Sequence, residues 1–257
     1  LIKSGINVSG LVFAKDVNTT LAFVHLNEKG DRSFSFYRNP GADMALSVED
    51  IKFDLVENAR IFHFGSVSLT DEPSRTATIK AAGIAKEKGL IISYDPNLRP
   101  PLWKSLDEAR KMICQGLYYA DILKLSEDEL EFITGSSSLE TASKDIMDKY
   151  GINMIYVTLG KKGCFYRWKE STGIAPAYDV RTIDTTGAGD AFLGGILYQI
   201  LEAGKDINQL TTEEVSSFVD FANAVGSLST IKKGAIPAIP TLDEIIYCMK
   251  NTQKLMV

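Results

Sequence analysis

The sequence predicts an α/β protein of three layers, in which helices cover both faces of a mostly parallel central sheet. From residue 61 onward, short apolar runs alternate with helical segments, and this alternation places successive strands parallel to one another. The 257 residues, 45% of them hydrophobic and 24% charged, can bury a large core as one domain. We therefore expect a single domain over residues 1–257, with a small β appendage at residues 17–38.

The first predicted elements form a hairpin. Val17–Leu26 and Ser33–Arg38 are predicted strands on either side of the turn-rich Asn27–Gly30. Alternate residues of the second strand give an apolar face that ends at Arg38. An isolated hairpin is marginally stable, so it must cover another surface or pair with a second copy. On pattern alone, Arg38 is either a solvated charge on a strand edge or a ligand contact.

The later elements alternate between strands and helices. Ile61–Val67 is a predicted strand, and the helix that follows, Asp71–Lys88, has Pro73 in its first turn and Gly89 beyond its last. The remaining elements are a strand at Leu90–Tyr94, a helix opened by the capping box Ser105–Glu108, and strands at Asp121–Leu125 and Asn153–Thr158. Ligands of parallel sheets gather at the carboxyl ends of strands. Four polar loops in such positions are candidates for the site: Asp95–Arg99, Ser126–Glu129, Thr158–Gly163 and Asp184–Asp190.

The most informative segment is Asp184–Asp190, with the sequence Asp-Thr-Thr-Gly-Ala-Gly-Asp. It lies between a strand-like run, Val180–Ile183, and a helix-like run, Ala191–Ala203. Glycines let the backbone turn its N–H groups outward, where they and the positive end of the helix dipole attract a phosphate. A carboxylate at Asp190 is suited to take a proton from a hydroxyl that attacks the phosphorus atom. The segment favours phosphoryl transfer, with an acid-capped turn that binds nothing as the alternative.

Other functional classes are excluded by specific residues. A dinucleotide-binding fingerprint needs a third glycine where Phe192 stands, and the motifs of P-loop proteins and protein kinases are absent. The net charge of −5 argues against nucleic-acid binding, and no apolar run approaches the length of a membrane span. The three cysteines are far apart in the sequence, which predicts buried thiols in a reducing, cytoplasmic compartment.

The Asp184–Asp190 segment resembles the C-terminal signature of the ribokinase/PfkB family of sugar and nucleoside kinases. Further stretches resemble that family in the same order along the chain. These stretches are Phe36–Arg38 with Gly41–Met44, Phe62–Ser66, Asp95–Arg99, Val157–Gly160 with Gly163, and Lys232–Pro237. The details are most similar to the fructokinases, and next to the 2-keto-3-deoxygluconate kinases. The resemblance implies a ribokinase-like fold, with the 17–38 hairpin as a lid that pairs between the subunits of a homodimer.

The resemblance also implies a reaction and its residues. The γ-phosphate of ATP passes in line to a primary hydroxyl of a small sugar, with fructose to fructose 6-phosphate as the first choice. Asp190 is the base, the N–H groups of Gly187, Ala188 and Gly189 stabilise the transferring group, and Mg²⁺ bridges the phosphates. The implied sugar contacts are Arg38, Asn97, Arg99 and Asp190. The implied nucleotide contacts are Ser126, Thr158, Gly160, Gly163, Gly187, Gly189 and Asn223. The implied metal residues are Glu129 for Mg²⁺ and, in a stretch that approaches K⁺ in parts of the family, Asp184 and Thr186.

Structural roles compete with several of these assignments. Ser126 and Glu129 have the spacing of a capping box, and the Asp184 and Thr186 side chains can cap the helix that follows them. The Thr158–Gly163 loop can be a hairpin turn, and Asp95–Asn97 an ordinary turn. Small residues around Asn223 can serve helix packing alone.

Alternatives also remain for the whole protein. A 2-keto-3-deoxygluconate kinase would use Arg38 or Arg99 for the substrate carboxylate, and ribose or a nucleoside are further acceptors. A catalytically silent nucleotide-binding regulator is the alternative from another class. The family's first strand and its Gly-Gly-x-x-x-Asn segment have no counterpart in this chain, so we expect further residues before Leu1.

Overall fold

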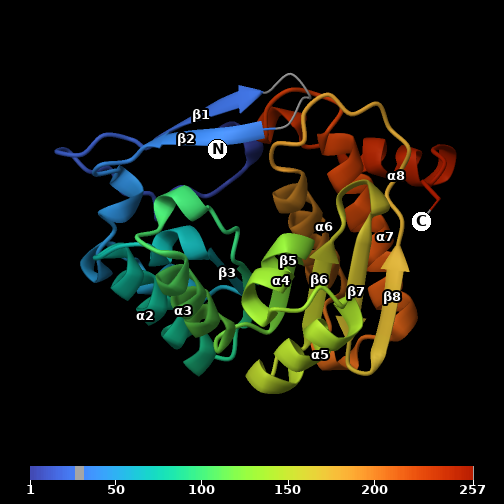
Figure 1. The fold of residues 1–257 in the computed structure, drawn as a ribbon, viewed down its shortest axis with the longest axis horizontal. Helices are drawn as coiled ribbons and strands as arrows, with labels where there is room; N and C mark the ends of the chain where they lie inside the picture. Colours follow the sequence, from blue (N-terminus) through green and yellow to red (C-terminus); the bar gives the residue numbers. More distant parts are fainter. Residues whose placement is uncertain (27–31, 257) are drawn as a thin grey trace. The chain divides into compact units, whose positions relative to one another are not determined.

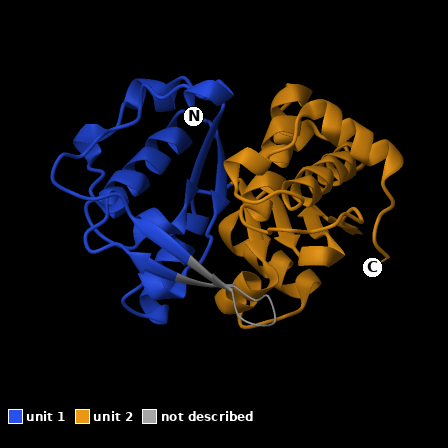
Figure 2. Cartoon of the chain, turned by 90° about the horizontal axis from the view of Figure 1, so that it is seen from above, with its two compact units in different colours: residues 1–120 blue, residues 121–257 orange. Residues whose placement is uncertain are grey.

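The computed structural model describes residues 1–26 and 32–256, so the predicted turn at Asn27–Gly30 lies outside the described residues. The chain divides into two compact units, residues 1–120 and 121–257, which Figure 2 colours separately. The single domain that the sequence predicts over residues 1–257 stays a prediction.

The first unit begins with the predicted hairpin. Strand β1 (Leu21–Leu26) pairs antiparallel with β2 (Arg32–Tyr37), with Leu21 opposite Tyr37. The first strand starts four positions later than predicted, at Leu21 rather than Val17. Short 3-10 helices of this unit lie at Ile2–Ser4, Ala42–Met44, Val48–Asp50, Ser66–Leu69 and Pro100–Leu102.

A parallel βαβ arrangement forms the rest of the first unit. Strands β3 (Ile61–Gly65) and β4 (Ile91–Asp95) pair in parallel, and α2 (Ser74–Glu87) connects them. Helix α2 buries alanines such as Ala77, Ala81 and Ala85, whose small side chains let a helix approach its neighbours closely. The other helices are α1 (Phe53–Glu57) and α3 (Leu106–Leu117), and the N-terminus of α3 is capped by Ser105 as predicted.

The second unit contains four strands in one sheet. Strands β5 (Ile122–Ser126) and β6 (Met154–Thr158) are parallel, whereas β7 (Cys164–Trp168) and β8 (Ser171–Ala175) continue as antiparallel neighbours. The sequence predicted the parallel pair, and it offered the turn from Thr158 into residues 164–167 as an alternative role of that loop. The first four residues of β6 are all buried, because both of its faces are covered.

Helices cover both faces of this sheet. Helices α4 (Glu127–Thr134) and α5 (Leu139–Tyr150) connect β5 to β6 and lie on one face, and α6 (Ala188–Ala203) and α7 (Thr212–Ser229) lie on the other (Figure 1). Helix α8 (Leu242–Asn251) packs against α7. Short 3-10 helices lie at Gly160–Lys162, Ile207–Gln209 and Ile236–Ala238.

The predicted strand at Val180–Ile183 is wrong. These residues have no regular secondary structure, so the segment before α6 is a loop. Its backbone bonds elsewhere: the N–H groups of Ile183 and Asp184 donate to the carbonyl of Thr230, at 2.7 and 3.0 Å. The partner is the turn that ends α7 rather than a strand, and the local sequence cannot reveal such a distant partner. Helix α6 also starts three residues earlier than predicted, at Ala188.

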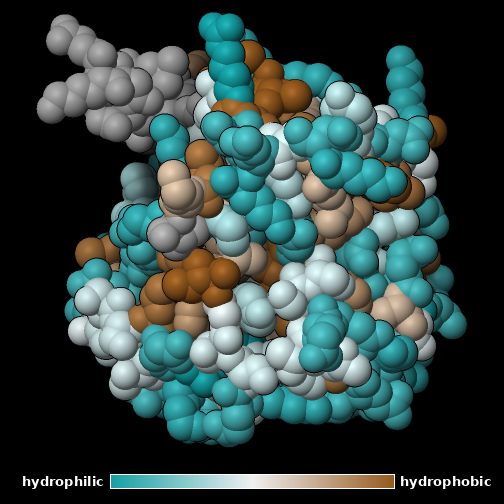
Figure 3. Space-filling view, turned by 90° about the vertical axis from the view of Figure 1, so that its right-hand side faces the viewer, coloured by the Kyte–Doolittle hydropathy of each residue, from teal (hydrophilic) through white to brown (hydrophobic). Residues whose placement is uncertain are grey.

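The surface and the cysteines agree with the composition. Figure 3 shows one face on which hydrophilic side chains dominate and hydrophobic ones gather in separate areas, as is usual where protein meets water. Within the described residues, no helix combines the length and the apolar character that a membrane crossing requires. Cys164 and Cys248 are buried free thiols, as predicted, and Cys114 is half-buried.

Candidate active site

Helix α6 begins at the glycine-rich segment that the sequence singled out. Gly187 is its N-cap and has a φ of 78°, a left-handed conformation that glycine adopts without steric cost. The helical hydrogen bonds start with the N–H of Ala191, which donates to the carbonyl of Gly187 at 2.8 Å. The N–H of Ala188 donates to the carbonyl of Thr185 at 3.2 Å, so that group already has a protein acceptor. The first turn of α6 points its remaining donors and its positive dipole outward.

Asp184 shapes the loop that leads into α6. One carboxylate oxygen accepts the N–H of Thr186 at 2.8 Å, and the other accepts the N–H of Gly234 at 3.0 Å. The same side chain therefore closes its own turn and attaches the segment after α7. The sequence offered capping of the following helix as the alternative for Asp184, but the N-cap of α6 is Gly187 without a side-chain cap, so Asp184 shapes the preceding turn instead. Its assignment as a metal residue, with Thr186, stays a prediction.

Asp190 has a different environment from Asp184. It is exposed on the first turn of α6 and lines a mainly apolar cavity of about 560 Å³ that also contacts Gly187. Among the residues that the structure describes, none forms a hydrogen bond or ion pair with its carboxylate. An accessible carboxylate of this kind can accept a proton from a ligand hydroxyl.

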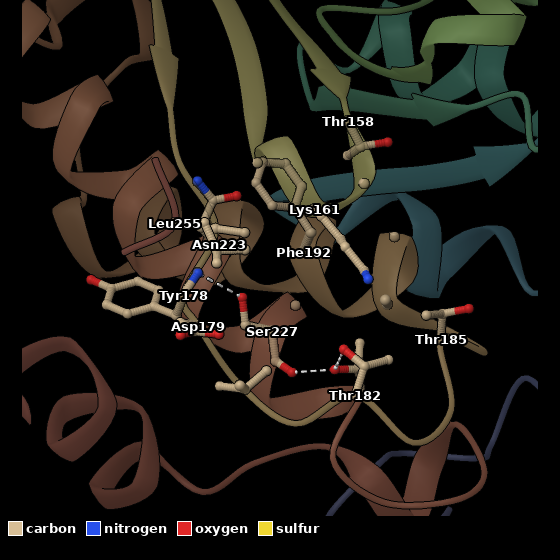
Figure 4. Close-up of a pocket in the computed structure, with 18 residues that line it drawn as sticks. Thr158, Lys161, Tyr178, Asp179, Thr182, Thr185, Phe192, Asn223, Ser227 and Leu255 are labelled. Atoms are coloured by element: carbon tan, nitrogen blue, oxygen red, sulfur yellow. Dashed lines mark hydrogen bonds between the residues drawn. The ribbon is translucent and has the colours of Figure 1, made fainter. Parts of the chain in front are cut away.

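A second cavity, of about 520 Å³, is also lined by residues of this turn (Figure 4). It brings together residues from three segments that the sequence predicted as nucleotide contacts. These residues are Thr158, Gly160, Gly163, Gly189 and Asn223. Ala188 lines the same cavity, whereas Gly187 lines only the cavity beside Asp190. The first turn of α6 therefore separates a glycine-lined cavity from the exposed carboxylate.

Gly163 allows the two walls of the 520 Å³ cavity to approach each other. Its φ is 92°, and a Cβ atom at this position would lie 2.0 Å from the carbonyl oxygen of Ala175. Asn223 reaches the same segment from α7, because its Nδ2 donates to the carbonyls of Ala175 and Pro176 at 2.8 and 3.2 Å. Asn223 therefore lines the cavity and also fixes one wall of it.

Ser126 and Glu129 form the predicted capping box at the start of α4. The N–H of Ser126 donates to Glu129 Oε2 at 2.8 Å, and the N–H of Glu129 donates to Ser126 Oγ at 3.2 Å. Ser126 does not line the 520 Å³ cavity. Within the described part of the chain, no group of three or more His, Cys, Asp or Glu side chains could hold a metal ion. A Mg²⁺ ion held by one or two carboxylates and substrate phosphates does not need such a group.

The first unit contains the three predicted sugar contacts other than Asp190. Asn97 follows β4 with a φ of 50°, a left-handed conformation that asparagine tolerates better than most residues. Arg99 is half-buried in the same loop, and its Nη1 donates to the carbonyl of Leu98 at 3.2 Å. Arg38 is different, because its guanidinium is only 5% exposed and bonds to protein groups on several sides.

The partners of Arg38 all belong to the first unit. Its Nε and Nη2 contact Asp43 Oδ2 at 2.7 and 2.6 Å, Nη1 donates to Thr70 Oγ1 at 2.8 Å, and Nη2 donates to the carbonyl of Val67 at 3.2 Å. Thr20 donates a further hydrogen bond to Asp43. Arg38 therefore holds the segment after β2 against the segment after β3. The solvated edge charge considered from the sequence is not what the structure contains.

This ion pair predicts a pH-dependent stability. Burial raises the pKa of Asp43, but hydrogen bonds from Arg38 and Thr20 and the charge of Arg38 hold the pKa below its usual value of 3.8. The carboxylate therefore stabilises the fold above the unfolded pKa, and that contribution is lost as the pH falls through the native pKa. After a discount for solvent at the partly exposed Asp43, we expect Asp43→Asn to cost about 1 kcal/mol at pH 7, or about 2–4 °C in Tm.

The measurement is thermal unfolding of wild type and variant from pH 7 down to pH 3. The difference in Tm should shrink toward the acidic end, because protonation of Asp43 there begins to remove the charge that the variant lacks. Asp16→Asn, at an exposed aspartate of the same unit, is the control and should change Tm little at any pH. A difference in Tm that is constant with pH would contradict the ion-pair explanation.

Several residues of the 520 Å³ cavity were not predicted from the sequence. Tyr178 and Ser227 contribute through a hydrogen bond from the Tyr178 N–H to Ser227 Oγ at 3.1 Å (Figure 4). Phe192 lies in the helix after the glycines, and Lys161 in the turn before β7. Phe192 follows Gly189 by three residues and Ala188 by four, a spacing that puts the three on one face of α6 and is a local signal for its place at the cavity.

Comparison with known proteins agrees with this geometry. A family model described as "pfkB family carbohydrate kinase" matches residues 1–242. Fructokinase-2 of Solanum habrochaites is 44% identical over 249 residues, which are 96% of this chain and 75% of that protein. Fructokinase-1 of Zea mays is 45% identical, over 96% of this chain and 76% of its own length.

Solved structures give the same result. The fructokinase of Xylella fastidiosa with bound ATP has a TM-score of 0.89 and 32% sequence identity, and the match covers 97% of this chain and 79% of that one. A double mutant of the Vibrio cholerae O395 fructokinase, with fructose, ADP and a potassium ion bound, has a TM-score of 0.87 and 33% identity over 96% of this chain and 78% of that one. These matches confirm the predicted α/β/α fold class. The chain belongs to the PfkB family of carbohydrate kinases.

Proposed function

We propose that this chain is an ATP-dependent fructokinase, which transfers the γ-phosphate of ATP to a primary hydroxyl of fructose and gives fructose 6-phosphate. One observation carries the proposal: the first turn of α6 lies between a glycine-lined cavity of about 520 Å³ and the exposed carboxylate of Asp190. Fructokinases at 44% and 45% identity support the choice of sugar.

The 520 Å³ cavity fits a nucleotide in size and in chemistry. Its volume lies within the range of small-molecule sites, and glycines on two sides leave room for a flat ring. At one end of the cavity, the N–H groups of α6 can donate hydrogen bonds to phosphate oxygens. We therefore propose that Thr158, Gly160, Gly163 and Asn223 surround the nucleoside and that Gly189 faces its phosphates. Ser126 acts at a distance, through the cap of α4.

Asp190 is the proposed general base. Its carboxylate accepts the proton of the attacking sugar hydroxyl while the oxygen of that hydroxyl bonds to the γ-phosphorus. The bond from the γ-phosphorus to the leaving oxygen of ADP breaks. The charge that develops on the transferring group is stabilised by backbone N–H groups of the 187–189 turn. The N–H of Ala188 can contribute only if it breaks or shares its hydrogen bond to the carbonyl of Thr185.

Metal and sugar contacts complete the proposal. If Mg²⁺ is bound, it would offset the charge of the nucleotide phosphates. Glu129 is the carboxylate proposed to hold it, and Asp184 and Thr186 are proposed near K⁺. Asn97 and Arg99 are proposed as sugar contacts. Arg38 is proposed to act mainly by fixing the 41–44 segment, because four of its contacts are already to protein atoms. A homodimer through the 17–38 lid stays a prediction.

The test is ADP release with Mg²⁺-ATP against fructose, 2-keto-3-deoxygluconate, ribose and adenosine, beside a control without sugar. We expect turnover that depends on fructose. An Asp190→Asn preparation, purified identically, controls for a contaminating kinase. Preference for another acceptor would keep the mechanism and replace the substrate. ATP binding without any acceptor-dependent turnover would favour the catalytically silent regulator.

A further inference from the structure

Lys124 is a buried cation that no step of the proposed mechanism uses. It lies in the middle of β5 and is 6% exposed, whereas lysine side chains are almost never buried to this degree without a specific environment. Nothing in the local sequence distinguishes it, because Ile122–Ser126 is otherwise an ordinary buried strand. The function of Lys124 therefore depends on which part of the molecule its ammonium contacts.

The register of the sheet places Lys124 under helix α6. Lys124 pairs with Tyr156 of β6, so both side chains point to the same face. Tyr156 contacts Phe192 of α6 edge-on, with ring centroids 6.0 Å apart, which identifies that face as the one covered by α6. Side chains of Lys124 and Phe192 thus belong to one packed layer between the sheet and the helix.

The ammonium reaches the first turn of α6. A Cβ atom at Gly189 would lie 2.8 Å from Lys124 Nζ and 3.3 Å from its Cε. The lysine tip therefore lies against the side of Gly189 that a side chain would occupy. This contact gives Gly189 a second reason to be glycine, beyond access for a ligand: any other residue would displace the ammonium.

Two sources of positive potential therefore coincide at one turn. The N-terminus of α6 carries the positive end of the helix dipole, and the Lys124 ammonium lies next to it. The positive end of the dipole and the ammonium repel each other, and an anion held at the turn stabilises both. The potential acts through a buried environment, where it is screened less than at a surface. Gly189 lines the 520 Å³ cavity, so the anion in question is one held in that cavity.

We propose that Lys124 is a positioning residue for the phosphate groups of the nucleotide, acting through the Gly189 turn rather than by direct contact. The inference rests on the proposed function, because it assumes that phosphates occupy the α6 end of the 520 Å³ cavity. Its chemical consequence is selective: Lys124 strengthens the binding of a phosphorylated ligand and is indifferent to the same nucleoside without phosphates.

The test compares ATP with adenosine in calorimetric titrations of wild type, Lys124→Met and Lys124→Arg. Methionine keeps the length of the side chain without the charge. We expect Lys124→Met to weaken ATP binding about tenfold, as for the loss of one charge-assisted interaction, and to change adenosine binding by less than about twofold. Lys124→Arg retains the cation and should recover most of the affinity for ATP.

Arg167→Met is the matched control. Arg167 is a second buried cation of the same unit, 5% exposed on β7, and it bonds to Glu140 and Ser143 rather than to α6. Its loss should lower Tm without changing the ratio of ATP to adenosine affinity. An equal loss for both ligands in Lys124→Met would overturn the inference, as would the same selective loss in Arg167→Met. If Lys124→Met does not fold, Lys124→Gln takes its place: a selective loss of ATP affinity is expected, and an equal loss for both ligands would overturn the inference.

The outcomes for the two proposals can be told apart. Wild-type protein that binds ATP but phosphorylates no sugar would overturn the proposed function, and the comparison of ATP with adenosine would still decide the role of Lys124. Wild-type protein that binds ATP no better than adenosine would overturn the assumption that phosphates occupy the cavity and, with it, the role of Lys124.

Discussion

Replacement of Asp190 by asparagine should lower kcat by at least about 10²-fold, the usual contribution of a general base. The amide keeps the size of the side chain and cannot accept the hydroxyl proton. The Kd for ATP should change little, because the glycine-lined cavity lies on the other side of the α6 turn from the carboxylate. Steady-state turnover with saturating fructose and ATP, together with a separate ATP titration, measures both effects.

Asp179→Asn is the control for this prediction. Asp179 is an exposed carboxylate that lines the 520 Å³ cavity, so the control removes one negative charge from the cavity without touching Asp190. Its kcat should stay close to that of wild type. If Asp190→Asn turns over at the wild-type rate, Asp190 is not the base. An equal loss of kcat in both variants would point to the local charge rather than to proton transfer.

Substitution of Gly163 by alanine should cause the largest loss of stability among the glycines of the 520 Å³ cavity. The new Cβ atom would lie 2.0 Å from the Ala175 carbonyl oxygen and 2.7 Å from the Ala177 nitrogen, and backbone atoms cannot move aside as the end of a side chain can. The φ of 92° adds strain. Together these terms should cost at least about 3 kcal/mol, or about 6–12 °C in Tm.

ATP binding should weaken with Gly163→Ala as well. The new methyl group would push the Ala175 and Pro176 carbonyls, which accept the hydrogen bonds of Asn223. The cavity wall and the Asn223 side chain should therefore move together. Gly160→Ala is the control, because Gly160 has a φ of 57° but no atom within 4 Å of a Cβ. Gly160→Ala should lose only the stability that a left-handed conformation costs a residue with a Cβ atom, about 1–2 kcal/mol. Equal changes of Tm in the two variants would show that the clash is relieved without cost.

Elements whose signals are local could be predicted from the sequence. The four strands from Ile61 to Thr158 each lie within two residues of their predicted ends, because apolar runs bounded by polar loops are strong signals. The cap at Ser105 and the capping box at Ser126 are contained within four residues each, so they were equally visible. The irregular segment at 180–183 was not predictable, since its backbone partner is Thr230.

The candidate site divides in the same way. Its glycines and Asp190 stand in one heptapeptide, and a family resemblance added Thr158, Gly163 and Asn223, which the structure places around one cavity. The contact between Lys124 and Gly189, by contrast, joins a strand to a helix far along the chain and has no signature in either segment. The internal partners of Arg38 could not be predicted either, because Asp43 and Thr70 contact Arg38 together only when the first unit is folded.

The hydrogen bonds of Asp184 have a thermodynamic consequence. One carboxylate joins the N–H groups of Thr186 and Gly234, which are separated by about fifty residues of sequence. The shape of the turn that is proposed to receive an anion is therefore coupled to the order of the Lys232–Gly234 segment. Any ligand that binds the ordered turn more tightly must stabilise that distant segment by the same free energy, and any contact that orders the segment must tighten the turn in return.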